Sequence, residues 1–81
     1  MSDPVQSPAH YCINGYECLD VIRAIVEASG MPPYEAFLYG SAMQYVWRYK
    51  MKNGVQDIDK AIRYLGWIRE ELERQEEGGT I

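Results

Sequence analysis

The chain has 81 residues and a formal net charge of −4 at pH 7, with 12 Asp and Glu against 8 Lys and Arg. This length suits one small domain, which buries only about 60% of its unfolded surface and usually needs disulfides, metal or oligomerisation for stability. The acidic balance excludes a generic duplex-DNA binder, since such proteins normally carry a basic stripe over one face.

Large apolar residues are numerous for so short a chain: seven Tyr, two Trp, one Phe and four Met. We expect part of this surface to be buried against another copy. Strand-like alternation is not evident along the chain. The predicted fold is therefore all-α, a small three-helix domain with a long central helix, assembled as a homo-oligomer.

The start of the chain differs in composition from the rest. Residues 1–9 contain two prolines and no periodicity, and residues 78–81 are Gly-rich. We expect a flexible arm at 1–9, one helical domain at 10–77 and a disordered tail at 78–81.

With only two cysteines, no signal peptide and no long apolar run, the expected location is the cytoplasm. The spacing His10-x-Cys12 lacks a CxxC knuckle, so no metal site is expected.

Apolar periodicity predicts the helices in chain order. After a turn at Asn14-Gly15, the first helix is expected at 16–28. The second begins at a proline, which is tolerated in the first helical turn, and spans 33–51. An Asn53-Gly54 break follows, and the third helix runs over 57–75 with an aspartate as its N-cap.

The second helix carries a stripe that mixes aromatic, polar and cationic residues. Its members fall at i, i+4, i+7, i+8, i+11 and i+15, namely Phe37, Ser41, Gln44, Tyr45, Arg48 and Lys52. These positions share one helix face. This stripe is the first candidate binding surface, and the alternative is a solvated face with one incidental aromatic.

The third helix has two distinct faces. The predicted core seam is Ile58, Ala61, Ile62, Leu65, Ile68 and Leu72, interrupted by Arg69. The opposite face gathers Lys60, Arg63, Tyr64 and Trp67. A Trp outside the seam needs either a second chain or a ligand to cover it.

A short connection between antiparallel helices would bring Arg48 and Lys52 near Asp57, Lys60 and Tyr64. With Mg²⁺ bound through Asp57 or Asp59, such a cluster could hold a phosphate. Without Mg²⁺ it would be an ion-pair network. The sequence leaves both interpretations open.

Five motifs occur in order between residues 10 and 65, within a resemblance that covers about residues 9–72. They are HY at 10–11, GYECLDVI at 15–22, GSAMQYVWR at 40–48, KNG at 52–54 and DIDKAIRYL at 57–65. Together they resemble the SaV-like family of small phage-encoded domains, to which phage nucleotide kinases lacking a P-loop are similar. The chain departs from that pattern at Ser41, where the family has Asn, and at Gln44, where it has Lys.

The resemblance implies nucleotide handling, and stacking aromatics beside cations point the same way. The candidate ligand-binding residues are His10, Tyr11, Ser41, Gln44, Tyr45, Arg48, Lys52, Lys60, Arg63 and Tyr64. For the only histidine, a structural role and a role as base or phosphate ligand are both open.

No GxxxxGK[ST] loop is present to cradle a triphosphate, so binding without turnover is favoured and no catalytic residue is assigned. The expected function is sequestration of a phosphorylated nucleotide signal of host immunity, linear or cyclic. One alternative is a nucleoside-monophosphate kinase assembled across an oligomer, which alone would need Mg²⁺. The other is a module that binds a host protein. The expected partners are a nucleotide and a second copy, with no duplex nucleic acid and no membrane.

Overall fold

The computed structural model describes residues 12–13 and 15–79. In chain order the elements are β1 (Cys12–Ile13), β2 (Tyr16–Glu17), α1 (Cys18–Ser29), α2 (Pro33–Arg48), the 3₁₀ turn η2 (Tyr49–Met51) and α3 (Val55–Gly79). The predicted all-α class with three helices is confirmed. The predicted arm at 1–9 and the candidate residues His10 and Tyr11 lie outside the described residues.

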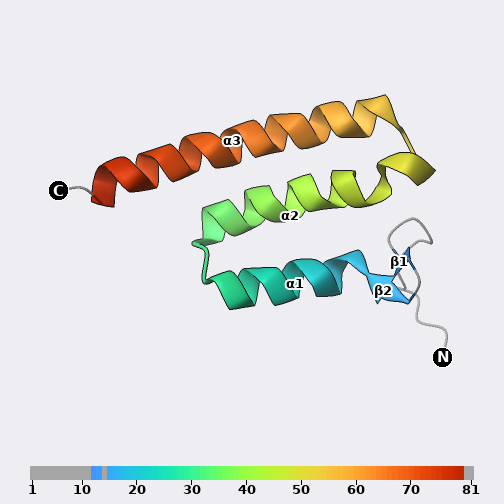
Figure 1. Cartoon of the computed structure of the whole chain (residues 1–81), viewed down its shortest axis with the longest axis horizontal. Helices are drawn as coiled ribbons and strands as arrows, with labels where there is room; N and C mark the ends of the chain where they lie inside the picture. Colours follow the sequence, from blue (N-terminus) through green and yellow to red (C-terminus); the bar gives the residue numbers. More distant parts are fainter. Residues whose placement is uncertain (1–11, 14, 80–81) are drawn as a thin grey trace.

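The three helices lie side by side in one layer, with α2 in the middle (Figure 1). The chain is correspondingly flat, with extents of 52 × 29 × 19 Å. Helix α1 approaches α2 closely at Gly40, where a Cβ would meet the Ile22 side chain at 3.6 Å. Within the described residues, none of the helices combines the length and apolarity needed to cross a membrane.

The start of the described chain is a small antiparallel hairpin instead of a helical turn. Cys12 pairs with Glu17 and Ile13 with Tyr16, and Gly15 has a positive φ of 83° in the turn. The turn at this glycine is as predicted, but α1 begins two residues later than expected because β2 occupies those positions. Strands of two residues are too short to produce a recognisable alternation.

Helix α2 begins at Pro33 as predicted, and η2 carries the chain on to Met51, where the sequence placed the helix end. Helix α3 begins at Val55, two residues before the predicted start, and ends at Gly79. It therefore enters the segment 78–81, for which the sequence predicted a disordered tail. The C-terminal helix, with 25 residues, is longer than the central helix, with 16.

The centre of the α2–α3 contact is small and apolar. Leu38 and Ala42 of α2 and Ala61 of α3 are buried there. The predicted seam of α3 is correct for Ala61, but it is wrong for three further members, which are exposed: Ile62, Leu65 and Leu72. The face of α3 that contacts α2 instead has a buried carboxylate at each end, Asp57 and Glu71.

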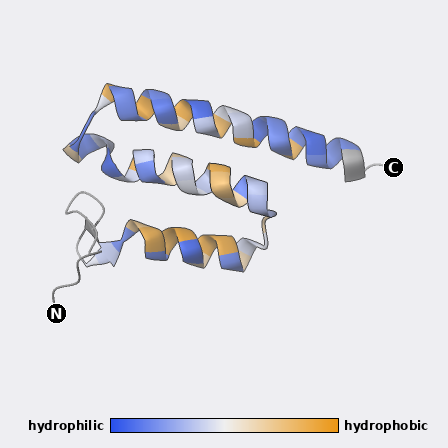
Figure 2. Cartoon of the chain, turned by 180° about the vertical axis from the view of Figure 1, so that it is seen from behind, coloured by the Kyte–Doolittle hydropathy of each residue, from blue (hydrophilic) through white to orange (hydrophobic). Residues whose placement is uncertain are grey.

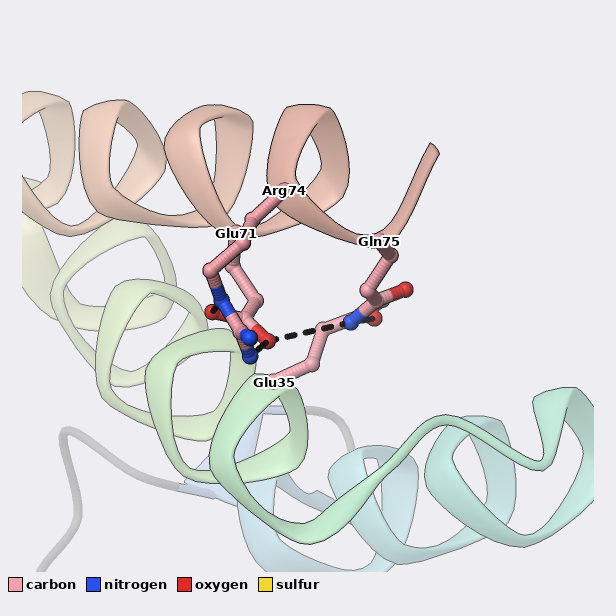
Figure 3. Close-up of polar contacts among 4 residues, drawn as sticks. All are labelled: Glu35, Glu71, Arg74 and Gln75. Carbon is pink, nitrogen blue, oxygen red and sulfur yellow. Dashed lines mark hydrogen bonds and ion pairs between the residues drawn. The ribbon is translucent and has the colours of Figure 1, made fainter. Parts of the chain in front are cut away.

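One of these carboxylates belongs to Glu71, near the C-terminal end of α3 (Figure 3). Arg74 Nη2 donates to Glu71 Oε2 at 2.6 Å, and Gln75 Nε2 donates to both Glu71 Oε2 at 3.3 Å and Glu35 Oε1 at 3.2 Å. The hydrogen bonds from Arg74 lower the pKa of Glu71 despite its burial. This cluster joins the last turns of α3 to the first turn of α2. It therefore helps to fix the rotation of α3 about its own axis.

Candidate functional site

The second buried carboxylate is Asp57, in the first turn of α3, and its side chain is fully buried. Arg48 Nη2 donates to Asp57 Oδ1 at 3.2 Å, the Asn53 backbone N–H donates to Oδ2 at 3.1 Å, and Asn53 Nδ2 donates to Oδ1 at 3.3 Å. Burial by itself would raise the pKa of Asp57, but these hydrogen bonds and the Arg48 charge outweigh it, so the pKa is lowered. The three residues fix the connection between α2 and α3.

Directly beside this connection, two tyrosines from different helices stack on each other. Tyr45 of α2 and Tyr64 of α3 have ring centroids 5.9 Å apart and planes inclined by 23°. The Lys60 ammonium lies 5.4 Å from the Tyr45 ring centroid, and the Arg48 guanidinium carbon lies 4.9 Å from it. Both distances are within the range of cation–π attraction. The pairing of α2 with α3 therefore creates an aromatic pair flanked by two cations.

The aromatic contacts continue along both helices away from the connection. Tyr64 meets Trp67 edge-on at 5.2 Å and Phe37 edge-on at 6.4 Å, and Phe37 in turn stacks with Tyr34 at 6.4 Å. We call this set the aromatic surface: Tyr34, Phe37, Tyr45, Tyr64 and Trp67. The rings of Tyr34, Phe37 and Trp67 are exposed, whereas Tyr45 and Tyr64 are half-buried. The surface thus offers three exposed rings next to two half-buried ones.

The remaining predicted ligand residues lie at different distances from this surface. Ser41 and Gln44 are half-buried on α2, in the same stripe as Phe37 and Tyr45. Arg63 is exposed on α3, three residues after Lys60 and therefore next to it on the helix.

Lys52 lies apart from the aromatic surface. It lines an open cavity of about 450 Å³ at the α2–α3 connection. The other residues around this cavity are Tyr49, Lys50, Gly54, Val55 and Ile58. The structure therefore does not bring Lys52 together with the aromatic surface.

The geometry also shows how Asp57 and Arg48 are engaged within the cationic cluster. Both Asp57 oxygens accept hydrogen bonds inside the protein and the side chain has no exposure to solvent, so this carboxylate is an ion-pair partner and not an available Mg²⁺ ligand. Arg48 is committed to the same pair, with its side chain 14% exposed. Asp59 is exposed, but across residues 12–13 and 15–79 no three His, Cys, Asp or Glu side chains gather as a metal site would require.

Sequence reasoning missed two parts of this arrangement. Tyr34 was not singled out, although its spacing of three residues from Phe37 places both on one helix face. Asn53 was interpreted only as a helix break, yet both its backbone and its side chain bind the buried carboxylate of Asp57. Asn at a turn commonly makes such local hydrogen bonds, so the signal was present.

Comparison with known proteins gives one family match. The model of the DUF3310 family, described as a protein of unknown function, matches residues 5–66. The chain therefore belongs to the DUF3310 family. Among curated proteins and among solved structures, no match was found.

Proposed function

We propose that this member of the DUF3310 family binds a nucleotide, or a small molecule derived from one, on the aromatic surface. The observation that carries the proposal is the stack of Tyr45 on Tyr64 beside Lys60, with exposed rings continuing from it. A base presents a flat π-face, and a phosphate presents negative charge. Adjacent aromatic rings and cations are the groups that recognise this combination.

Each part of the surface has a separate task in this proposal. The exposed Phe37 and Trp67 rings stack with the base. Lys60 and the neighbouring Arg63 attract phosphate, and both are exposed. Arg48 contributes indirectly, because its ion pair with Asp57 holds the helix ends that carry Tyr45 and Lys60.

The purpose that we propose is sequestration of a phosphorylated nucleotide signal of host immunity, in the cytoplasm of an infected bacterium. The resemblance to small phage-encoded SaV-like domains suggests this setting, and the sequence lacks a phosphate-cradling loop of the GxxxxGK[ST] type. Phosphoryl transfer also requires metal ions that bridge the phosphates. The commitment of Asp57 to Arg48 removes one of the two aspartates suggested as Mg²⁺ ligands, which favours binding over a kinase reaction.

Isothermal titration with nucleoside monophosphates, ATP-Mg²⁺ and cyclic dinucleotides tests the binding site. Phe37→Ala removes an exposed ring from the surface, and Tyr16→Ala removes an exposed ring from β2 as its control. Stacking contributes about 1–3 kcal/mol per base, so Phe37→Ala should weaken the binding nucleotide about 5- to 150-fold. Tyr16→Ala should leave affinity unchanged.

Lys60→Gln and Arg23→Gln form a second matched pair, because each removes one exposed cation and Arg23 lies on α1, which α2 separates from α3. We expect only Lys60→Gln to weaken binding and to reduce its dependence on salt concentration. Equal effects of the two variants would locate binding elsewhere. If no nucleotide in the panel bound to the folded wild-type protein, the proposed function would be wrong, and a protein partner would become the better hypothesis.

A further inference from the structure

A second surface of α3 is apolar, exposed and separate from the aromatic surface. Its members recur with alternating spacings of three and four residues: Val55, Ile58, Ile62, Leu65, Arg69 and Leu72. We call this set the α3 stripe. Its exposed apolar members range from 40% exposure at Leu72 to 76% at Val55, and the apolar positions recur along the α3 ribbon in Figure 2.

The position of the α3 stripe on the helix leaves it open to a partner. At 100° per residue, the stripe is centred roughly 120° from the face that contacts α2. Trp67 of the aromatic surface and the adjacent Lys60 lie roughly 140–180° from the stripe around the helix axis. The two surfaces are thus on opposite sides of α3, and occupation of one leaves the other accessible.

We propose that the α3 stripe is the contact between two copies of this chain, which pair through antiparallel α3 helices. Alternating spacings of three and four residues over nearly three heptads are the pattern of a two-helix seam. A single copy also buries little apolar surface: within the described residues, the buried hydrophobic side chains are Cys18, Leu38, Ala42 and Ala61. A second copy would cover the stripe over much of its length.

The charges along α3 select the antiparallel orientation. In a parallel, in-register pair, equivalent residues face each other, so Arg69 would meet Arg69 of the second copy and Glu76 would meet Glu76. Such like-charge contacts are unfavourable. In an antiparallel pair the acidic end of α3, with Glu73 and Glu76, lies beside Lys50 and Lys52 of the second copy. Opposite charges then meet at both ends of the contact.

The same orientation gives a register that matches the side chains. When the two helices are centred between Ile62 and Leu65, Ile62 of each copy faces Leu65 of the other. Arg69 then faces Ile58 of the second copy and comes within reach of the adjacent Asp59. Leu72 faces Val55, which lines the cavity of about 450 Å³ at the α2–α3 connection. The leucine of one copy therefore meets the second copy at a cavity lined by apolar residues and two lysines.

Sedimentation equilibrium of the full chain tests the contact. We expect the wild-type protein to associate, Leu65→Lys to remain helical by circular dichroism but to lose this association, and Leu19→Lys to keep the wild-type mass. Leu19 is the matched control because it is also an exposed leucine, but on α1. A wild-type monomer at all concentrations, or a Leu65→Lys protein of unchanged mass, would overturn the proposal.

Disulfide trapping tests the orientation in a Cys12→Ser background, in which the remaining Cys18 is buried. Mixing Val55→Cys with Leu72→Cys should give crosslinked pairs of the two variants, whereas Leu72→Cys alone should not crosslink with itself. Crosslinking of Leu72→Cys with itself, without mixed pairs, would show a parallel contact and contradict the charge argument.

Discussion

The α2–α3 contact that positions the candidate site should depend strongly on one side chain, Leu38. This residue is 1% exposed and is among the few fully buried side chains. Truncation of a buried leucine to alanine costs about 2–5 kcal/mol, because transfer free energy is lost and a cavity remains. The free energy of unfolding is about 0.05–0.15 kcal/mol per residue, which gives about 4–12 kcal/mol for a chain of 81 residues. Leu38→Ala should therefore remove a large fraction of the free energy of unfolding.

The matched control is Leu19→Ala, since the same atoms are removed from a leucine that is 56% exposed. This substitution should change stability by no more than about 0.5 kcal/mol. Thermal unfolding by circular dichroism, at one fixed protein concentration, provides the comparison. Each kcal/mol corresponds to about 4–8 °C in a domain of this size, so Leu38→Ala should lower Tm by at least about 8 °C. Equal losses for the two variants, or a loss below about 1 kcal/mol for Leu38→Ala, would refute this account of the core.

Acid should weaken the fold, because the pKa values of Asp57 and Glu71 are lower in the folded chain than in the unfolded chain. Their contribution is complete above the ordinary carboxyl pKa values near 4 and is lost as pH falls through the lowered values, so Tm should drop between about pH 4 and pH 2. A Tm that stays constant or rises over this interval would contradict the buried carboxylate pairs. Two glycines should respond in opposite directions to substitution by alanine, measured by urea unfolding. Gly66→Ala should stabilise α3 by about 0.5–1 kcal/mol, because no atom lies within 4 Å of the new Cβ and alanine favours helices. Gly30→Ala should destabilise by about 1 kcal/mol, because Gly30 ends α1 with a φ of 67°. Destabilisation by Gly66→Ala, or stabilisation by Gly30→Ala, would be inconsistent with the helix boundaries described here.

Local signals in the sequence were sufficient for the helix order. Proline at position 33 begins α2, and Gly54, with a φ of 52°, lies at the break before α3. The antiparallel pairing that such a short connection imposes also brings Arg48 of α2 to Asp57 of α3, as expected from the sequence. Lys52 was expected in the same cluster, but it lies at the separate cavity. These features depend on residues close together in the chain, and sequence patterns report such features well.

The rotation of α3 could not be predicted from apolar periodicity. Hydropathy ranks Ile62 and Leu65 as core residues and Asp57 and Glu71 as surface residues, yet the observed burial is the reverse. The reason is that each carboxylate has specific partners, and Arg48 is one that another helix supplies. A burial pattern that depends on long-range polar pairing is invisible until the helices are placed together.

Sequestration requires nucleotide binding without chemical change. Its most direct test is to incubate the purified wild-type chain with single nucleotides, cyclic dinucleotides and ATP-Mg²⁺ pairs, and then to separate free from bound ligand by filtration. We expect one nucleotide to be depleted from the filtrate and to return chemically unaltered, by chromatography, after the protein is denatured by heat. Formation of a new nucleoside diphosphate with multiple turnovers would contradict sequestration and establish a kinase.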